Sequence, residues 1–364
     1  MESFSFGRLI LLSTIAVLFG LVSCMLLKLA DKPKKDYIYV GGAVISSIMF
    51  AISITPITIL ASFLIFLSIM CIMSKNKSVV LMYSVSAVLL TAGYILTGTQ
   101  LGLVFKIFAY LSMIVAMPFH FWIPRIWGKL DYATVAANNI FSTLVGTTGI
   151  LKIIMVYPPV EMATIFTGIG FISVVYAAFS AISEQNIKKL IGYFDITQVG
   201  LILLDFGIGL MLVEIDTIGV IQFMNYAIAM PLLLLSIGWV VSKGKSENIS
   251  ILNGIAKTAP LLGIFIAISA LSFAGVPGLN IFISEWITYM LAMQVGNPFV
   301  VAIVAVAVIS CFIPFFKVFY TTFVGVSKLK IKISLPTKIL GIALTILCII
   351  LGLLPRLNLM IAGA

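Results

Sequence analysis

Residues 271–290 read "LSFAGVPGLNIFISEWITYM", a hydrophobic stretch that contains both a backbone interruption and a charge. Gly275, Pro277 and Gly278 interrupt the apolar run, and the acid Glu285 follows among Ile, Trp and Tyr. In water the interruption would be a turn and the acid a surface charge. In lipid both are costly, because unsatisfied backbone groups and charges are poorly tolerated there. The solvent around this stretch therefore decides how it folds.

The composition identifies that solvent as lipid. Hydrophobic residues make up 62% of the 364 residues and charged residues only 9%, far from the profile of a soluble domain. The apolar runs are continuous rather than alternating, which excludes a transmembrane β-barrel. At about 20 residues per crossing, the chain predicts an all-α polytopic membrane protein with about a dozen transmembrane helices.

Twelve segments are apolar enough to be candidate spans. They are residues 8–29, 37–54, 57–74, 78–98, 101–117, 133–156, 162–183, 187–212, 218–242, 259–294, 299–323 and 336–354. The length of 259–294 allows either one broken crossing or two crossings. The distribution of Lys and Arg can decide, because short cytoplasmic loops carry the excess of positive charge.

One broken crossing gives a consistent charge asymmetry. Alternate loops on one side then hold 17 of the 22 basic residues with five acids, whereas the opposite side holds two basic and four acidic residues. Two crossings would move the last four of those lysines to the other side. We therefore predict twelve helices, both termini on the non-cytoplasmic side, and one helix broken at "GVPG". The net charge of +10 then reflects topology and not nucleic-acid binding.

The cysteines and the N-terminus point to no cofactor in this chain. The N-terminal "LVSC" resembles a lipoprotein signal ending at Cys24, but the apolar run continues beyond it, which favours a transmembrane span. All the cysteines lie in apolar spans without C-x-x-C spacing, so no iron–sulfur cluster, haem or structural metal is expected. These cysteines are Cys24, Cys71, Cys311 and Cys348.

Several charged residues remain inside the predicted spans, where they often mark ion or proton paths. Each also has a structural interpretation. Lys317 lies near the cytoplasmic end of its helix and can reach the interface, and Asp195 could pair with Lys188 or Lys189. Lys106 and Lys152 lie in the outer third, where either interpretation holds. The full set is Lys106, Lys152, Asp195, Asp205, Glu285 and Lys317.

Glu285 is the strongest candidate for function among them. Irregular backbone within a membrane is tolerated only where protein or a hydrated cavity satisfies its polar groups. An acid beside such a break can bind water, and its proton affinity depends on burial and on neighbouring charges. We therefore expect Glu285 to take part in ion or proton transfer.

A second break is predicted within "MPFHFWIPRIWGKLDYATVAANN", residues 117–139. Pro118 and Pro124 end the preceding helix, and His120 is the only histidine of the chain. Imidazole is well suited to exchanging protons near neutral pH. The helix that follows is rich in hydroxyl and amide side chains, which either hold ordered water or join helices to one another. These side chains are Thr134, Asn138, Asn139, Ser142, Thr143, Thr147 and Thr148.

At these motifs the chain resembles the antiporter-like subunits of respiratory complex I, Mrp-type sodium/proton antiporters and membrane-bound energy-converting hydrogenases. "MPFHFWIP" at 117–124 is similar to the P-F-H-x-W-x-P segment of that family. "EQNIKKLIGYFDITQVGLILL" at 184–204 is similar to its Q-x-[DN]-[IL]-K-[KR]-L stretch, and residues 271–290 to its L-S-x-[AG]-G-[IV]-P segment.

The resemblance implies a fold of fourteen helices in two inverted five-helix repeats, with two discontinuous helices. This chain has room for about twelve, so its N-terminal part looks shortened. We expect four N-terminal spans in residues 1–100, an antiporter-like core of eight spans in 101–354, and a short tail at 355–364.

The family's functional charges carry over only in part. Glu285 matches the family's Lys-or-Glu position in the second broken helix, on the outlet side of its proton path. The family's pumping lysine falls on Met113, and its next lysine falls near Val145 or Thr147. The acid paired with the first lysine is replaced, with Ser62 as its expected occupant. Because methionine cannot carry a proton, Lys106 and Lys152 are the candidate substitutes in this sequence.

The sequence thus predicts a membrane-arm subunit of an ion-translocating oxidoreductase complex of the complex I or hydrogenase type. The expected proton or sodium pathway comprises Glu285, Lys188, Lys189, His120, Lys152, Lys106 and Asp205, with helix breaks at Pro118, Pro124, Gly275, Pro277 and Gly278. Iron–sulfur clusters, flavin or a nickel–iron site are expected only in partner subunits. The alternatives are a scaffold subunit that no longer conducts and a subunit of a free-standing cation/proton antiporter.

Overall fold

The computed structural model describes residues 6–122, 126–156, 160–212, 217–327 and 329–362. These residues form helices joined by short loops, with one isolated β-bridge between Asn186 and Asn248 as their only extended pairing. They divide into two compact units, residues 1–158 (unit 1) and 159–364 (unit 2). The predicted all-helical, multi-pass architecture is confirmed.

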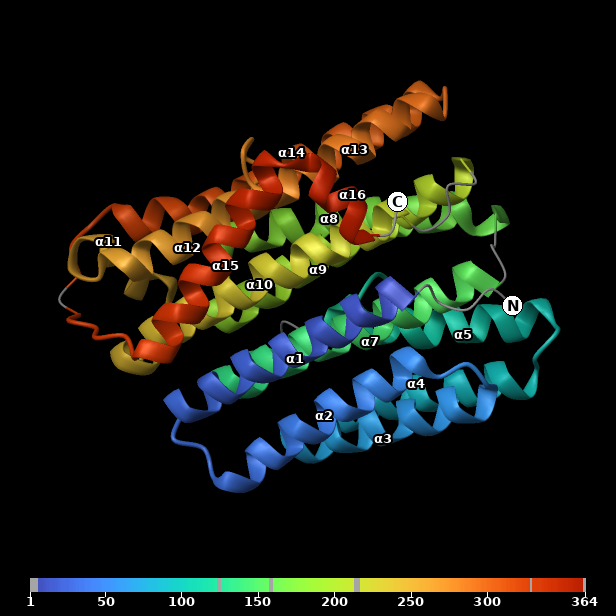
Figure 1. Ribbon diagram of the computed structural model, residues 1–364, viewed down its shortest axis with the longest axis horizontal. Coiled ribbons are helices and arrows are strands. Elements are labelled where there is room, and N and C mark those ends of the chain that lie inside the picture. The colour runs from blue at the N-terminus through green and yellow to red at the C-terminus, as the bar shows by residue number, and fades with distance from the viewer. Residues whose placement is uncertain (1–5, 123–125, 157–159, 213–216, 328, 363–364) are drawn as a thin grey trace. The chain divides into compact units, whose positions relative to one another are not determined.

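Unit 1 is a bundle around one buried helix, α7 (Figure 1). Its elements are α1 (Phe6–Leu29), α2 (Lys34–Ile52), α3 (Pro56–Ser74), α4 (Lys77–Ile95), α5 (Gln100–Met113), the 3-10 helix η1 (Phe119–Trp122) and α7 (Tyr132–Val156). Helices α1, α2, α3 and α5 all contact α7. The polar residues of α7 are therefore shielded from lipid.

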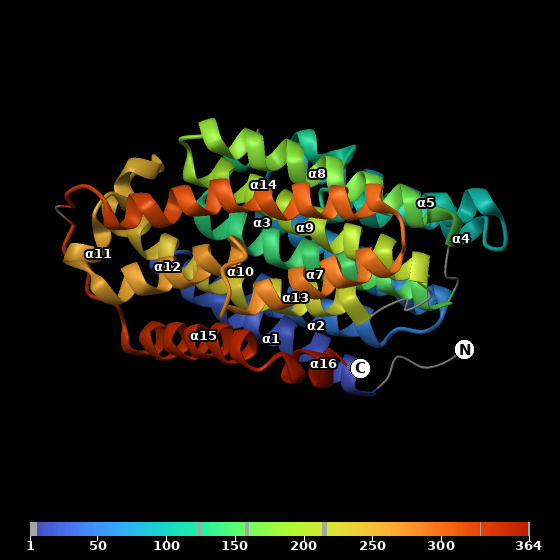
Figure 2. The ribbon, with the colours of Figure 1, turned by 90° about the horizontal axis from the view of Figure 1, so that it is seen from above.

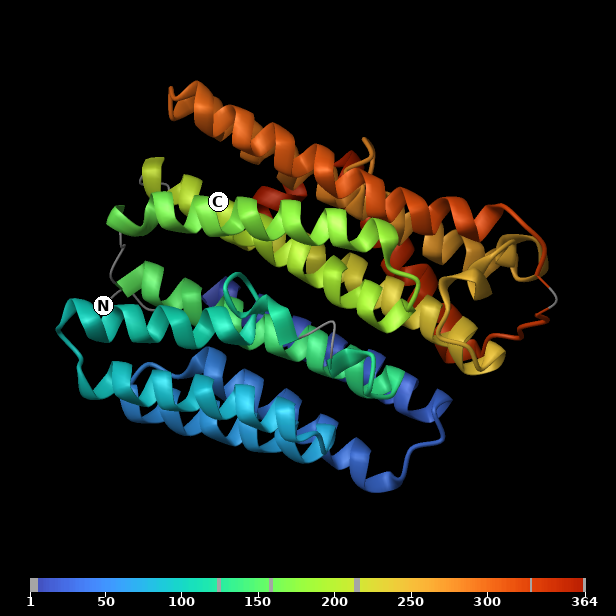
Figure 3. The same cartoon turned by 180° about the vertical axis from the view of Figure 1, so that it is seen from behind.

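In unit 2 the other helices pack around two buried helices, α9 and α10. Its elements are η2 (Val160–Met162), α8 (Ala163–Ser183), α9 (Ile187–Leu212), α10 (Thr217–Gly244), η3 (Ile249–Leu252), α11 (Ile255–Thr258), α12 (Pro260–Phe273), α13 (Asn280–Gln294), α14 (Pro298–Phe323), α15 (Leu335–Leu353) and α16 (Pro355–Ala362). Helices α8 and α14 lie side by side along α9 (Figure 3). Nearly every side chain of α9 from Leu190 to Leu210 is buried.

Helix starts follow the local sequence. The Thr55, Thr99 and Asn297 side chains each accept a hydrogen bond from a backbone N–H in the first turn of the helix that they precede. Pro56 and Pro298 occupy first helical positions, where the missing N–H costs nothing. Short polar caps thus place the helix ends within the compact loops that the sequence predicts.

The region 259–294 is one interrupted helix, as the charge pattern predicts. Helix α12 ends at Phe273 and α13 begins at Asn280, and the two follow one another along the single 26-residue helix α14 (Figure 2). Among the described residues, ten helices are by themselves long and apolar enough to span a membrane. Helices α5 and α12 are the two shorter apolar helices, and each precedes a break.

The predicted end of the span 101–117 is wrong by four residues, because α5 ends at Met113 before Pro118 is reached. Val115 adopts a left-handed backbone conformation (φ 61°), and the Ala116 N–H bonds back to the carbonyl of Leu111 at 3.3 Å. This Schellman motif terminates the helix. Pro118 lies beyond that turn, in a cis peptide bond with Met117.

Asp131 fixes the start of α7 from the loop side. Its carboxylate accepts hydrogen bonds from the backbone N–H of Thr134 at 3.1 Å and from the Thr134 hydroxyl at 2.7 Å. The Lys32 ammonium lies 2.9 Å from the same carboxylate. Burial acts to raise the pKa of Asp131, but the bonds from Thr134 and Lys32 outweigh it, and the pKa is lower than the ordinary value. The charged form is therefore the one that the fold stabilises.

We predict that Asp131→Ala lowers the stability of unit 1 by about 0.5–2 kcal/mol through loss of the cap, whereas Asp131→Asn keeps a capping oxygen and loses less. Because the folded-state pKa is lowered, the contribution of the charge is complete above an unfolded-state pKa of about 3.9. It disappears as the pH falls through the lowered folded value. Thermal unfolding of the detergent-solubilised chain at stepped pH checks this. A difference between wild type and Asp131→Asn that does not shrink on acidification would contradict it.

Candidate functional site

The break between α12 and α13, residues 274–279 (break 2), is built from a glycine-based helix end. Gly275 has a left-handed backbone conformation (φ 65°), and the Val276 N–H bonds to the carbonyl of Leu271 at 3.1 Å. Gly278 also has a positive φ, of 93°. Pro277 prevents the helix from continuing. The predicted helix-breaking residues Gly275, Pro277 and Gly278 therefore all lie in the observed break.

Glu285 projects from α13 onto this break. Its side chain is buried, with 5% of its surface exposed, and neither carboxylate oxygen has a hydrogen-bond partner among the described residues. A Cβ atom at Gly275 would collide with Oε2 of Glu285. Glycine is thus required at this position for two reasons. It can adopt the left-handed backbone conformation, and it leaves room for the Glu285 carboxylate.

Asp205 is the charged neighbour of Glu285. Its side chain, 1% exposed, comes from α9, and its Oδ1 accepts a hydrogen bond of 2.7 Å from the Thr288 hydroxyl. Thr288 follows Glu285 by three residues and so lies on the same face of α13. The bond from Thr288 therefore places the Asp205 carboxylate beside the face of α13 that carries Glu285, and Oδ2 of Asp205 has no partner among the described residues.

A polar stripe on α9 leads toward this pair of acids. Lys188, Asp195, Gln198 and Asp205 are seven, three and seven residues apart, a spacing that places them on one face of the helix. Helix α10 provides partners for the middle of the stripe. The Tyr226 hydroxyl donates to Asp195 at 2.8 Å, and the Gln222 amide donates to Gln198 at 3.3 Å.

Amide and hydroxyl groups of α10 and α13 surround break 2 itself. The Asn225 amide donates to the Ser284 hydroxyl at 3.3 Å, and the Asn280 amide donates to the carbonyl of Asn225 at 2.9 Å. Several buried polar atoms here have no partner among the described residues: Oδ1 of Asn225, Oδ1 of Asn280, Nε2 of Gln198 and Oε1 of Gln222. Buried polar groups normally find a partner, and internal water supplies it where side chains do not. The arrangement is suited to holding water.

Lys188 lies at the other end of the stripe, in the first turn of α9. Its ammonium pairs with Glu247 at 2.7 Å, although Lys188 is only 4% exposed. The backbone N–H groups of Lys188 and Lys189 are both capped by Asn186 Oδ1. The sequence suggested that Lys188 or Lys189 pairs with Asp195. In the structure Lys188 pairs with Glu247, and Asp195 accepts a hydrogen bond from Tyr226.

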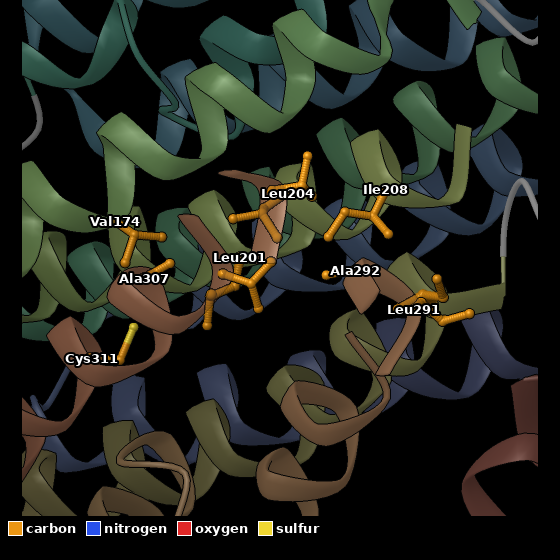
Figure 4. Packing of buried hydrophobic residues seen from close by; sticks show 11 residues of the cluster. Val174, Leu201, Leu204, Ile208, Leu291, Ala292, Ala307 and Cys311 are labelled. Carbon is orange, nitrogen blue, oxygen red and sulfur yellow. The ribbon is translucent and has the colours of Figure 1, made fainter. Parts of the chain in front are cut away.

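The adjacent face of α9 is apolar and packs tightly. Leu201, Leu204 and Ile208 meet side chains of α8, α13 and α14 (Figure 4). The other residues of this cluster include Val174, Leu291, Ala292, Ala307 and Cys311. One face of α9 therefore packs against apolar side chains, and another face carries the polar stripe. This packing keeps the polar stripe buried, away from the hydrocarbon.

The break in unit 1, residues 114–118 (break 1), has the same backbone motif but different contents. Val115 takes the left-handed position that Gly275 takes in break 2, and its side chain is 2% exposed. Met113 and Ile114 pack against Gly146 of α7 so closely that a Cβ there would collide with Ile114. Buried apolar side chains thus line break 1, whereas a carboxylate lies against break 2.

The two displaced lysines of unit 1 bind separate helix ends. Lys152 donates to the backbone carbonyl of Ser53, at the end of α2, and its ammonium lies 5.5 Å from the Phe50 ring centroid. Lys106 donates to the Thr97 hydroxyl at 3.3 Å and lies 4.4 Å from the Tyr94 ring centroid. Both contacts satisfy a cation near the end of a span.

Aromatic rings fill the interior next to Lys152. The rings of Phe50, Phe63 and Tyr110 have centroids 5.8 to 6.1 Å apart. Tyr110 also fills the space beside Gly149 of α7. Through Phe50, Lys152 therefore borders a cluster of packed aromatic rings.

His120 is half-buried in η1, beyond break 1, where its ring contacts Phe121. Pro124 lies outside the described residues. Lys317 donates to the carbonyls of Ile182 and Glu184 at 2.7 and 2.9 Å, so it caps the end of α8, in agreement with its structural interpretation. Of the predicted pathway residues, the structure brings Asp205 and Glu285 together and places Lys188 on the same helix face as Asp205.

Sequence reasoning overlooked most of the polar side chains of unit 2 that accompany these acids. They are Gln198, Gln222, Asn225, Tyr226, Asn280, Ser284 and Thr288. Their spacing carried a signal, since Asn280, Ser284 and Thr288 recur every four residues and mark one helix face. No group of three or more His, Cys, Asp or Glu side chains lies together as a metal site within the described ranges.

Relatives of this chain are subunits of several membrane complexes. It is 27% identical over 239 residues to hydrogenase-4 component B of Escherichia coli K12, a match that covers 58% of this chain and 35% of that protein. It is 25% identical over 265 residues to NADH-quinone oxidoreductase subunit N of Flavobacterium psychrophilum, covering 70% and 56%. The chain therefore spans between a third and somewhat more than half of these relatives.

Solved structures share its fold. A chain of respiratory complex I from Thermus thermophilus superposes with a TM-score of 0.81 at 18% identity, covering all of this chain and 90% of that one. A chain of the Mrp complex from Dietzia sp. gives 0.80 at 17% identity, covering 97% and 82%. These similarities establish the antiporter-like fold.

The contact between Gly275 and Glu285 gives a testable prediction with a matched control. Gly275→Ala and Gly278→Ala each place a side chain at a positive φ, which costs roughly 1–2 kcal/mol, but only the Gly275 variant also collides with Glu285. We expect Gly275→Ala to lower the unfolding temperature more. In a Glu285→Ala background the excess should disappear. Equal losses for the two glycines in the wild-type background would contradict the contact.

The family model for "NADH:quinone oxidoreductase/Mrp antiporter, TM" matches residues 43–310, which include both breaks and the polar stripe. That match covers most of the chain, and the fold agrees with it. The chain belongs to the membrane-subunit family shared by NADH:quinone oxidoreductases and Mrp antiporters.

Proposed function

We propose that this chain is a membrane-arm subunit of an ion-translocating complex and that unit 2 conducts protons through Glu285. The observation that carries the proposal is the position of Glu285. It is a buried acid at a helix break, without a hydrogen-bond partner among the described residues. Such a group is costly in a membrane interior and typically serves ion or proton transfer.

The polar stripe supplies the proposed route. Lys188 and Asp205 are 17 residues apart on α9, which corresponds to about 25 Å along the helix. Asp195 with Tyr226, and Gln198 with Gln222, lie between them and provide hydrogen-bonding groups about two turns from Lys188 and from Asp205, respectively. Protons would pass along water held by these side chains to the acids at break 2.

We assign no proton conduction to unit 1 in this proposal. Lys106 and Lys152 are bound near helix ends, Lys106 by the Thr97 hydroxyl and Lys152 by the carbonyl of Ser53, and apolar side chains line break 1. Met113, at the position of the family's pumping lysine, is fully buried and cannot carry a proton. We therefore assign conduction to unit 2 and regard Lys106, Lys152 and His120 as separate, local sites.

The partners follow from the relatives and the charge pattern. The related chains belong to hydrogenase, NADH-quinone oxidoreductase and Mrp assemblies, so we propose that redox cofactors, if the complex has them, reside in other subunits. The excess of basic residues in alternate loops supports an orientation with both termini on the non-cytoplasmic side.

The proposal is tested with Glu285→Gln in the assembled complex reconstituted into vesicles. We expect loss of most proton translocation, measured with a pH-sensitive dye at matched turnover, because glutamine keeps the shape but cannot exchange a proton. Met113→Leu is the matched control, a buried residue at the other break, and should leave translocation unchanged.

Other outcomes decide between the remaining functions. Unchanged translocation in Glu285→Gln would contradict conduction through this residue and favour a scaffold subunit. Purification of the native complex addresses the antiporter alternative. Co-purifying iron–sulfur or nickel proteins would exclude a free-standing cation/proton antiporter.

A further inference from the structure

Asp205 and Glu285 are both buried acids, and no cationic side chain among the described residues neutralises them. Neither makes an ion pair or accepts a bond from a basic side chain within the described part of the chain. Two adjacent buried carboxylates cannot both be ionised without a large desolvation and repulsion cost. The pair must therefore hold a cation, and the structure indicates which one.

The surrounding helices contain no titratable group that could replace that cation. Helices α9, α10, α12, α14 and α15 pack against α13. Their other titratable side chains are Lys188, Lys189, Tyr193 and Asp195 on α9, Tyr226 and Lys243 on α10, Cys311, Lys317 and Tyr320 on α14, and Lys338 and Cys348 on α15. The lysines lie toward helix ends, where Lys188 pairs with Glu247 and Lys317 bonds carbonyls of α8. Cys311 of α14 is a buried thiol, which is ordinarily neutral at physiological pH.

The hydrogen bonds distinguish the two acids from one another. Thr288 donates to Asp205 Oδ1 at 2.7 Å, and such a bond favours the ionised form of its acceptor. Glu285 receives no bond from the described residues and lies against the Gly275 backbone. Asp205 is thus the better site for the negative charge and Glu285 the better site for a proton.

The available ligands favour a proton over a metal ion. Three oxygens of the pair have no partner in the part of the chain that the structure describes, namely both oxygens of Glu285 and Oδ2 of Asp205. A hard metal cation requires a shell of about six or more oxygens, so it would need water or the amide oxygens of Asn225 and Asn280 in addition to this pair. One donor and one acceptor suffice for a proton.

We propose that Asp205 and Glu285 are a coupled carboxyl pair that holds one proton, carried by Glu285 while Asp205 is ionised, which makes Asp205 the residue that sets when Glu285 releases it. This inference rests on the proposed function for its role in transport. The proton-sharing itself is a property of the resting protein, so it can be measured without transport.

The test is infrared spectroscopy of the full chain in detergent. The wild-type minus Glu285→Gln difference spectrum should contain the band of a protonated carboxyl group at neutral pH. In Asp205→Asn, the pH at which this band disappears should fall by roughly one unit or more, because a repelling charge is removed. Asp36→Asn is the matched control, a buried acid of α2 in unit 1 that lies outside the polar stripe, and should leave that pH unchanged.

Thr288→Val provides a second, independent variant. Removing the hydroxyl that stabilises ionised Asp205 should move the proton toward Asp205 and weaken the Glu285 band. An absent Glu285 band in the wild type, or an unchanged titration in both Asp205→Asn and Thr288→Val, would overturn the proposal. So would loss of the band in sodium chloride but not in potassium chloride, which would identify sodium as the occupant.

These outcomes are separate from those of the transport assay. A Glu285 band that shifts as expected, together with full proton translocation in Glu285→Gln, would confirm the shared proton and refute conduction through it. Loss of translocation without a band would refute the shared proton and leave the conducting role in place.

Discussion

A broken helix inside a membrane has to satisfy its own backbone, and this requirement organises unit 2. The break between α12 and α13 closes by a Schellman motif at Gly275, whose backbone conformation and missing side chain admit the Glu285 carboxylate. Exposed to lipid, the freed polar groups would cost several kcal/mol each. Enclosed by α9, α10 and α14, they form part of a polar interior instead.

Helix α9 makes that interior possible because its faces differ. Leucine and isoleucine side chains pack against α8 and α14, whereas Lys188, Asp195, Gln198 and Asp205 line another face. Unit 1 repeats the break but fills it with Val115, Met113 and Ile114. The same backbone device thus supports a polar site in one unit and an apolar core in the other.

Much of this could be predicted from the sequence, for identifiable reasons. A helix that crosses lipid needs a long apolar run, so most helices could be predicted from such runs. The distribution of lysines among the loops predicted the single interrupted crossing at 259–294. The end of α5 could not be predicted, because Val115, a β-branched residue, gives no warning of a left-handed turn. Glu247 and Thr288 were also missed, since their partners on α9 lie dozens of residues away and depend on helix packing.

The two breaks share a backbone conformation, but we propose that only break 2 borders a hydrated interior. A cryo-EM map of the native complex, at a resolution that shows ordered water, distinguishes the two. We expect a file of water along the polar stripe of α9 from Lys188 to Glu285, and none beside Met113 in break 1. A dry stripe in unit 2, or a water file through break 1, would contradict it.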